Sequence, residues 1–370
     1  MSSAPLSTLK GFGYVLVHGG RCGMAAESRA GHKQVRRRFA RRAEAFLGIM
    51  AVLALAVFAQ WLGGYLPLLG ASVTGLVLGV LLRLTLGLPG RWVPGVRLAS
   101  NQLLKLAIVC LGAGMSLGQI WKTGSQAILI ILASVVLGIA VCAHLGRRLG
   151  VSYELSQLIG VGTSICGATA IAATAPIIRA NEMDTAYAVS TLFTFNLLAV
   201  FVYPLTGHLL GLDDVSFGMW AGTAIHDTSS VVAAGYAYSD RAGDVATVIK
   251  LTRTLFLLPV VLTIGIACSL RSNGKKVTDL RMVQKAFPLF LLGFLAFALI
   301  RTSAVLPASL LDAFYGMGKF LAVVALVAIG LSSDLREMRR SGFKPLFLGL
   351  AAAAAVGVVS LVLIQVLHPR

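Results

Sequence analysis

Apolar residues dominate this chain from about residue 46 onward, and they occur in continuous runs rather than in alternation. Most runs hold about 17–25 residues, which is the length that an α-helix needs to cross the hydrocarbon core of a bilayer. Continuous runs exclude a transmembrane β-barrel, because its strands alternate between apolar and polar positions. The pattern therefore predicts an all-α polytopic membrane protein.

Eleven apolar runs, separated by polar or charged turns, predict about eleven transmembrane helices. They cover residues 46–66, 71–86, 100–117, 125–146, 155–178, 185–209, 215–238, 245–269, 286–301, 312–331 and 344–367. Residues 1–44 precede this transmembrane domain of residues 45–370 and form a basic arm. Such an arm holds a terminus in the cytoplasm and attracts anionic lipid, whereas a disordered tail is the plain alternative.

The positions of the basic residues predict the orientation of the chain. The net charge of +18 does not indicate a nucleic-acid partner, because Lys and Arg cluster at the ends of apolar runs. With the N-terminus in the cytoplasm, 23 basic residues fall inside and five, Arg179 among them, fall outside. Cytoplasmic loops carry such an excess, so we expect the C-terminus on the opposite side. The five cysteines lack metal-ligand spacing, and we expect no metal and no cofactor.

Two polar stretches interrupt the helices and are near copies of each other. They are Gly162-Thr-Ser-Ile-Cys-Gly-Ala-Thr-Ala170 and Gly222-Thr-Ala-Ile-His-Asp-Thr-Ser-Ser230. An ionisable residue at membrane depth costs about 2.5–3.5 kcal/mol on insertion scales and so has a functional reason or a partner. Clustered glycines and hydroxyls indicate unwound segments, whose N–H groups and helix ends suit an anion. Close helix packing is the alternative for the glycines.

Lys250 and Arg253 are basic residues well inside a predicted helix. They are three apart and share a face, and Arg253 lies roughly 12 Å along the helix axis. We expect both to line a polar cavity, with snorkelling to the surface as the alternative. Asp227 is the one acid deep in the bundle, so this region has an excess of positive charge, which selects anions.

His226 and Asp227 are the candidates for carrying a coupling proton, because a His side chain titrates near neutral pH and desolvation can raise the pKa of an Asp toward it. A simpler role for Asp227, pairing with Lys250 or Arg253 to neutralise them, stays open. The candidate substrate-binding residues are Gly162, Thr163, Ser164, Cys166, Gly167, Thr223, His226, Thr228, Ser229, Lys250 and Arg253.

A weak internal repeat is also present. The segments 105–120 and 319–335 end in Gly114-Met-Ser and Gly330-Leu-Ser, and they point in opposite directions in the predicted topology. Opposite directions are what an inverted-repeat transporter predicts. The two polar stretches run the same way if each helix spans once. Either one of these helices is re-entrant, or the two stretches share a task rather than a repeat.

The two polar stretches, together with Lys250-x-x-Arg253-x5-Pro259 and the Gly-Leu-Ser that ends at Ser332, resemble the sulfate exporter family of YeiH-like inner-membrane proteins. The resemblance covers residues 45–368 and implies a small inorganic or organic anion as substrate and the bacterial inner membrane as location. The C-terminus would then face the periplasm.

The sodium/proton antiporter and bile-acid symporter superfamily is a more distant resemblance. It implies two inverted five-helix repeats with discontinuous helices, at residues 71–209 and 215–367. One departure is visible, because antiporters of that superfamily use paired acids in the core. Here only Asp227 is deep, which argues against sodium coupling.

Three classes of function remain open at this stage. A secondary anion transporter, most simply an exporter, fits the excess of positive charge and the absence of a nucleotide-binding P-loop. The alternatives are an uncoupled anion channel and an intramembrane enzyme that uses Ser164 or Cys166 with His226 and Asp227. A homodimer is compatible with each of them.

Overall fold

The computed structural model describes residues 44–65, 70–271, 288–333 and 342–367, so the predicted basic arm lies outside the described residues. The described chain is helical and contains no strand, which confirms the all-α prediction. Within it, seven helices are long and apolar enough to cross a membrane, and two shorter apolar helices accompany them. The chain is a polytopic membrane protein.

Nine of the eleven predicted runs form membrane-crossing or slightly shorter helical segments in the described chain. These are Glu44–Gly63, α2 (Gly70–Thr85), α3 (Val93–Leu98) joined through a π-helical turn (Ala99–Leu103) to α4 (Leu104–Leu111), α5 (Leu117–Leu149), α8 (Glu182–Leu209), α11 (Asp240–Leu255) with α12 (Leu257–Arg271), α14 (Phe290–Ser303), α15 (Ala308–Ser332) and α17 (Phe343–Leu367).

The fifth and seventh predicted runs are each split into two short helices. The fifth forms α6 (Tyr153–Ser164) and α7 (Ala168–Thr174), and the seventh forms α9 (Asp214–Ala224) and α10 (Thr228–Tyr238). The breaks fall at residues 165–167 and 225–227, inside the two polar stretches. The predicted discontinuous helices are therefore confirmed.

Each pair of short helices folds back on itself as a re-entrant hairpin. Ser152, which precedes α6, donates a hydrogen bond of 3.2 Å to Asp184 in the first turn of α8, so the chain returns to the level where α6 began. In the second hairpin, Phe217 near the start of α9 stacks on Tyr238 at the end of α10, with 3.9 Å between ring centroids. Each hairpin thus enters and leaves the bundle on one side.

The two hairpins enter from opposite sides, because α8 crosses the bundle between them. Gly162 of α6 packs on Leu192 of α8, and Gly222 of α9 packs on Ile249 of α11. Each hairpin therefore packs against the long helix that follows it in the chain. The two polar stretches are therefore inverted copies at the tips of opposed hairpins. This answers the open question about their direction. The larger repeats at 71–209 and 215–367 stay a prediction.

One predicted position is wrong. Arg179 follows the first hairpin and precedes the N-cap of α8, Asn181, so it lies on the side where α6 begins. The sequence pattern predicts residues 155–178 as one helix that crosses the membrane once, which would place Arg179 on the opposite side. The corrected position puts Arg179 together with Arg147 and Arg148, at the end of α5, and strengthens the charge asymmetry from which the orientation was predicted.

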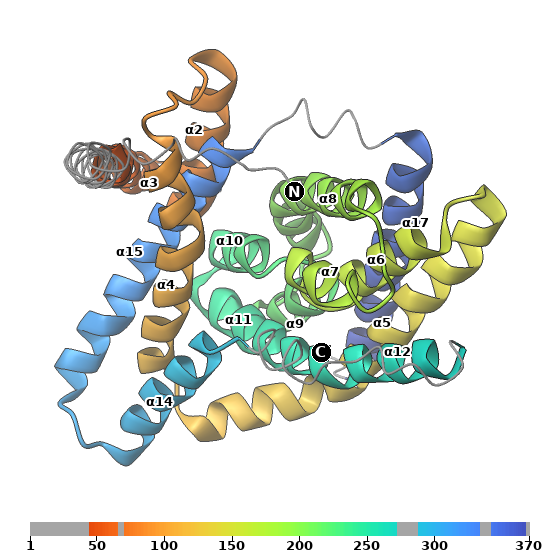
Figure 1. Cartoon of the computed structure of the whole chain (residues 1–370). Helices are drawn as coiled ribbons and strands as arrows, with labels where there is room; N and C mark the ends of the chain where they lie inside the picture. The colour runs from red at the N-terminus through yellow and green to blue at the C-terminus, as the bar shows by residue number, and fades with distance from the viewer. Residues whose placement is uncertain (1–43, 66–69, 272–287, 334–341, 368–370) are drawn as a thin grey trace, which may run out of the picture.

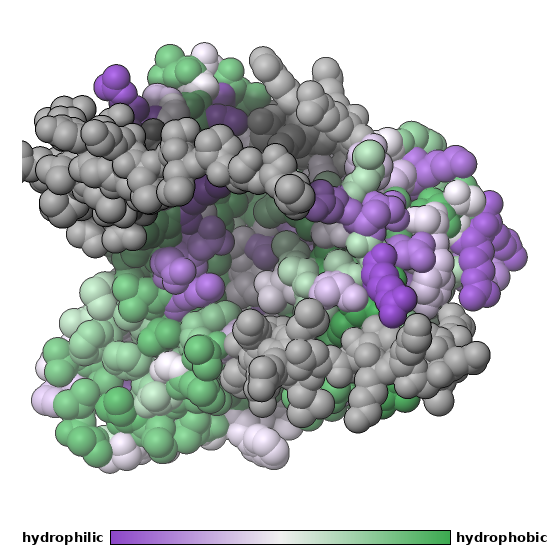
Figure 2. Space-filling model, viewed as in Figure 1, coloured by the Kyte–Doolittle hydropathy of each residue, from purple (hydrophilic) through white to green (hydrophobic). Residues whose placement is uncertain are grey.

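The helices form two groups that lie side by side (Figure 1). The hairpin group contains α5 to α12 and α17, coloured yellow, green, teal and dark blue. The companion group contains Glu44–Gly63, α2 to α4, α14 and α15, coloured orange and lighter blue; α15 packs mainly on α2 and α4. Figure 2 shows the same face hollowed near its middle, with hydrophilic side chains in the hollow.

Candidate functional site

The tips of the two hairpins meet, and we refer to residues 165–167 and 225–227 as the hairpin crossing. A methyl group added at Gly167 would lie 3.6 Å from Cβ of Asp227, which is ordinary van der Waals contact. Gly167 has φ +66° and ψ −130°, a conformation that glycine adopts readily and other residues avoid. The backbone of the first tip can turn there because this residue has no side chain.

Arg253 holds the ends of both entering helices. Its Nε donates to the carbonyl of Ser164 at 2.6 Å and its Nη2 to the carbonyl of Thr163 at 2.6 Å. Its Nη1 donates to the carbonyl of Thr223 in the other hairpin. The side chain is fully buried. The planar guanidinium thus supplies three donors to carbonyls that the C-terminal ends of α6 and α9 leave without helical partners.

Lys250 completes the same arrangement one turn earlier on α11. Its Nζ donates to the carbonyl of Ile165 at 2.7 Å and to that of Ile225 at 2.9 Å, and it is also fully buried. Cations stabilise the negative end of a helix dipole. Both predicted basic residues therefore lie in the site, but they bind the protein's own backbone rather than line an open cavity. Snorkelling to the surface is excluded for both.

Glycines bring α11 close enough for these contacts. A Cβ at Gly218 or Gly222 of α9 would lie 2.8 Å from the carbonyl oxygen of Ala242 or Ala246, respectively, so neither position has room for a larger residue. The two glycines are four apart and lie on one face of α9. This close approach lets the side chains on α11 reach the tips of both hairpins.

Asp227 caps the start of α10. Its Oδ2 accepts hydrogen bonds from the backbone N–H of Ser229, at 2.9 Å, and from the hydroxyl of Ser229. Its own N–H donates to Oδ1 of Asn196 on α8 at 3.2 Å. The ion pairs found among the described residues are Arg301–Asp312 and Lys319–Asp240. The carboxylate of Asp227 is therefore held by a helix N-terminus and a hydroxyl.

Two polar atoms at the crossing are buried without a hydrogen-bond partner among the described residues: Oγ of Ser164 and Nδ1 of His226. The imidazole also contacts the backbone of Thr163. A buried polar atom without a partner is uncommon in a native structure and calls for a reason such as a ligand, an ordered water or a transferred proton. These two atoms are not bonded to each other, so the structure shows no contact between the hydroxyl of Ser164 and Nδ1 of His226 of the kind that the enzyme alternative would use.

The side chains that remain accessible at the crossing lie on the two helices that leave it. Thr169 of α7 is exposed, and Asp227 and Thr228 of α10 are half-buried, whereas Cys166 and Gly167 are buried. A ligand would therefore reach the starts of α7 and α10 first, with the two cations behind them. Within the described chain, no cluster of three or more His, Cys, Asp or Glu side chains could hold a metal ion.

Several predicted residues have structural roles inside their own helices. The hydroxyls of Thr163 and Thr223 donate to carbonyls one turn earlier, at 2.8 and 2.7 Å. Gly162 lies within α6, where an added Cβ would be 2.3 Å from Cδ1 of Leu192, so it serves packing and not unwinding. Ser229 is bonded to Asp227, as described above.

A family model and several curated relatives match most of this chain. The family described as conserved hypothetical protein 698 matches residues 47–349. The chain belongs to this family. A UPF0324 membrane protein of Clostridium tetani is 35% identical over 327 residues, which cover 85% of this chain and 95% of the relative. Another, from Fusobacterium nucleatum, is 33% identical over 340 residues, covering 86% and 97%.

A third relative, the UPF0324 membrane protein of Streptococcus pyogenes serotype M18, is 36% identical over 321 residues, covering 85% of this chain and 95% of the relative. These names specify a membrane protein and no substrate. They support the resemblance drawn from the motifs at the level of a membrane family, and not the narrower level of sulfate export.

Asn196 is a site residue that the sequence reasoning missed. Its amide lies near the middle of α8 and is buried, with 5% exposure. A polar amide at membrane depth was a usable signal, because buried polar groups in helices need partners. The partner, the N–H of Asp227, is supplied by a segment 31 positions away and could not be read from the local pattern.

Proposed function

We propose that this protein is a secondary transporter that carries a small anion across the bacterial inner membrane, most simply as an exporter. The observation that carries the proposal is the charge at the hairpin crossing. Two formal positive charges, on Lys250 and Arg253, are fully buried there, and Asp227 supplies one negative charge. The partial charges of two helix C-termini and two helix N-termini cancel. The remaining positive charge favours an anion over a cation.

The anion would bind at the starts of α7 and α10. The hydroxyls of Thr169 and Thr228 are the accessible donors beside that surface. Binding near a helix N-terminus is favourable for an anion, and a carboxylate already occupies part of this position. Protonation of Asp227 would remove the like charge and make room for a substrate charge. The proposal therefore includes proton coupling through Asp227, with His226 as the second titratable group at the crossing.

The same geometry supports a carrier over an open channel and argues against sodium coupling. A methyl group added at Gly167 would contact Asp227, and the residues around them are largely buried, which fits a carrier that is closed at the crossing better than an open pore. Unwound carbonyls in broken helices commonly coordinate Na⁺. Here the ammonium of Lys250 already occupies the carbonyls of Ile165 and Ile225.

Candidate substrates come from the resemblance to the sulfate exporter family: sulfate, sulfite, thiosulfate and small sulfonates. The test is anion flux in vesicles that contain the purified protein, with and without an imposed pH gradient. We expect flux of at least one of these anions to depend on the gradient. Flux that is equal with and without the gradient would favour an uncoupled channel, and Na⁺-driven flux would overturn the proposed coupling.

A further inference from the structure

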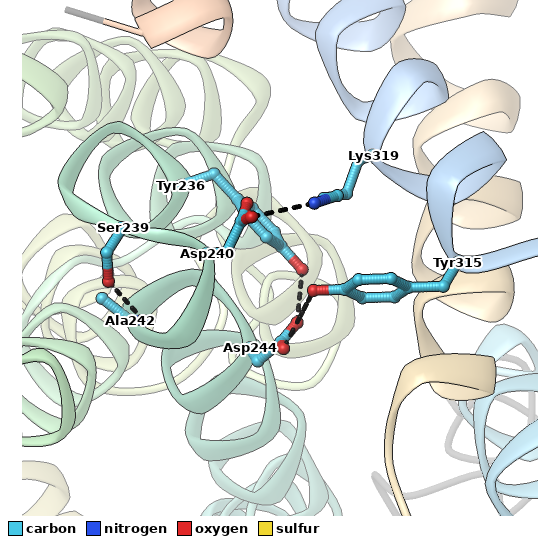
Figure 3. A network of polar contacts seen from close by, with 7 residues as sticks. All are labelled: Tyr236, Ser239, Asp240, Ala242, Asp244, Tyr315 and Lys319. Atoms are coloured by element: carbon cyan, nitrogen blue, oxygen red, sulfur yellow. Dashed lines mark hydrogen bonds and ion pairs between the residues drawn. The ribbon is translucent and has the colours of Figure 1, made fainter. Parts of the chain in front are cut away.

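A second polar cluster joins the hairpin group to the companion group, away from the hairpin crossing (Figure 3). We refer to it as the clasp; it consists of Tyr236, Asp240, Asp244, Tyr315 and Lys319. Nζ of Lys319 lies 2.9 Å from Oδ2 of Asp240. The hydroxyl of Tyr236 donates to Asp244 at 2.6 Å, and that of Tyr315 donates to the two oxygens of the same carboxylate at 3.1 and 3.0 Å.

The clasp is a two-point contact between α11 and α15, each of which packs mainly within its own group. Asp240 and Asp244 are four apart on α11, and Tyr315 and Lys319 are four apart on α15, so each pair lies on one helix face. α15 packs mainly on α2 and α4, and α11 packs mainly on α9 and α10. Polar side chains therefore bridge the two groups at this level.

Where α10 faces the companion group, the interface is apolar. On α10, Ala233 and Ala237 are buried against Val73 and Leu76 of α2 and Leu326 of α15. Small side chains let two helices approach closely and offer no interlocking ridge that would hold them in one register. The directional contacts of the clasp thus fix the relative position of the two groups more than this apolar surface does.

Asp244 is the titratable group on which the clasp converges. It faces two phenols, one from α10 and one from α15, and its neighbouring charges are Asp240 on its own helix and Lys319 on α15. Lys319 is paired with Asp240 and lies 5.0 Å from the ring centroid of Tyr315, and the ion pairs found among the described residues do not include Asp244. Hydrogen bonds to an ionised carboxylate are roughly twice as strong as neutral ones. Loss of the charge would weaken both phenol contacts together.

We propose that Asp244 is a proton-binding site at which ionisation clasps the two helix groups together and protonation lets them separate along α10. This goes beyond the proposed function, because it needs no anion. α10 also connects the hairpin crossing to the clasp. Asp227 caps the start of α10, and Tyr236 lies near its end, eight positions after Thr228 or roughly 12 Å along the helix. A change in the clasp therefore acts on the helix whose start forms the crossing.

The test measures opening of the interface in purified protein in detergent, without any added anion. Ala233→Cys is the reporter, because Ala233 is fully buried between the groups. Ser303→Cys, at an exposed position, is the reference that corrects for the pH dependence of thiol chemistry. The quantity is the ratio of the two maleimide modification rates, each taken above the rate of the protein without the added cysteine.

We expect this ratio to rise roughly fivefold between pH 8 and pH 5.5 in the otherwise unchanged protein. Asp244→Asn, which is uncharged at every pH, should give the high ratio at both values. Asp312→Asn removes an ion pair within the companion group, Arg301–Asp312, and should leave the ratio unchanged. A pH-independent ratio in the parent, or an Asp244→Asn protein as protected as the parent, overturns the proposal.

A second variant keeps the proposal testable if Asp244→Asn does not fold. Tyr315→Phe removes one hydroxyl from α15 and leaves the carboxylate of Asp244 in place with Tyr236 as its remaining phenol. We expect it to raise the ratio at pH 8 above that of the parent. The same low ratio as in the parent would show that the clasp does not hold the groups together.

Discussion

Gly167 faces Asp227, 60 positions later in the chain, so closely that a methyl group added at Gly167 would contact it, and the two residues bring together the tips of two hairpins that enter the bundle from opposite sides. Each residue ends a break and begins a helix: α7 follows Gly167 and α10 follows Asp227. Behind these two residues, Lys250 and Arg253 bind the carbonyls at which α6 and α9 end. The site is therefore built from four helix ends and two buried cations.

Arg253→Lys should destabilise the protein. The structure shows three guanidinium nitrogens on three separate carbonyls, which one ammonium cannot reach together. Each buried acceptor left without a donor costs about 1–3 kcal/mol. Thermal unfolding in detergent should show a clearly lowered Tm, and an unchanged Tm would mean that these contacts do not support the fold.

Asp227→Asn should leave the protein folded and remove the dependence of transport on pH. Asn is as good an N-cap as Asp, and the carboxylate is held by Ser229 rather than by an ion pair. We expect the free energy of unfolding to change by less than about 1 kcal/mol. If Asp227 instead serves to neutralise the cations, the variant should unfold readily and adding Lys250→Met should restore part of the loss.

Gly167→Ala and Gly162→Ala separate the two roles of the glycines. Gly167 has φ +66°, and a residue with a side chain held in such a conformation costs about 1–3 kcal/mol. An added Cβ at Gly162 meets the flexible end of Leu192, which can shift. Thermal unfolding should therefore show the larger loss for Gly167→Ala. The reverse order would contradict the strained turn at the first hairpin tip.

Cysteine labelling tests the re-entrant first hairpin. Arg179→Cys and Arg148→Cys, at two exposed positions, should react from the same side of the membrane with an impermeant thiol reagent, because the hairpin returns to the side where it began. Leu210→Cys, at an exposed position beyond α8, should react from the opposite side. Labelling of residues 179 and 148 from opposite sides would restore a single crossing for residues 155–178.

The helices and the two breaks in them could be predicted from the sequence, because both follow from local patterns. Long apolar runs gave the helix positions, and the polar residues inside two of these runs marked the breaks. The path of the chain after each break could not be predicted, since a kinked helix and a hairpin have the same composition. The hydrogen bond between Ser152 and Asp184 identifies the first break as a hairpin, and this contact exists only in the folded chain.

The roles of individual side chains were harder to predict for the same reason. Lys250 and Arg253 were correctly placed at depth, but their partners are backbone carbonyls of distant segments, which no sequence pattern displays. Asp244 lies just before the predicted helix of residues 245–269, and no local pattern marks it as a residue that contacts another helix. Its partner Tyr315 comes from a helix 71 positions later in the chain.

The proposed anion site is tested most directly by asking whether anions or Na⁺ stabilise the protein. Purified protein in detergent is heated in the presence of sulfate, sulfite, thiosulfate or methanesulfonate at constant Na⁺, and in a second series with Na⁺ varied at a constant anion. A ligand at about 100 times its Kd stabilises a folded protein by roughly 2.7 kcal/mol, which a shift in Tm reveals. The positive charge at the crossing predicts that at least one oxyanion raises the Tm and that Na⁺ does not. A Tm that rises with Na⁺ and ignores all four anions would contradict it.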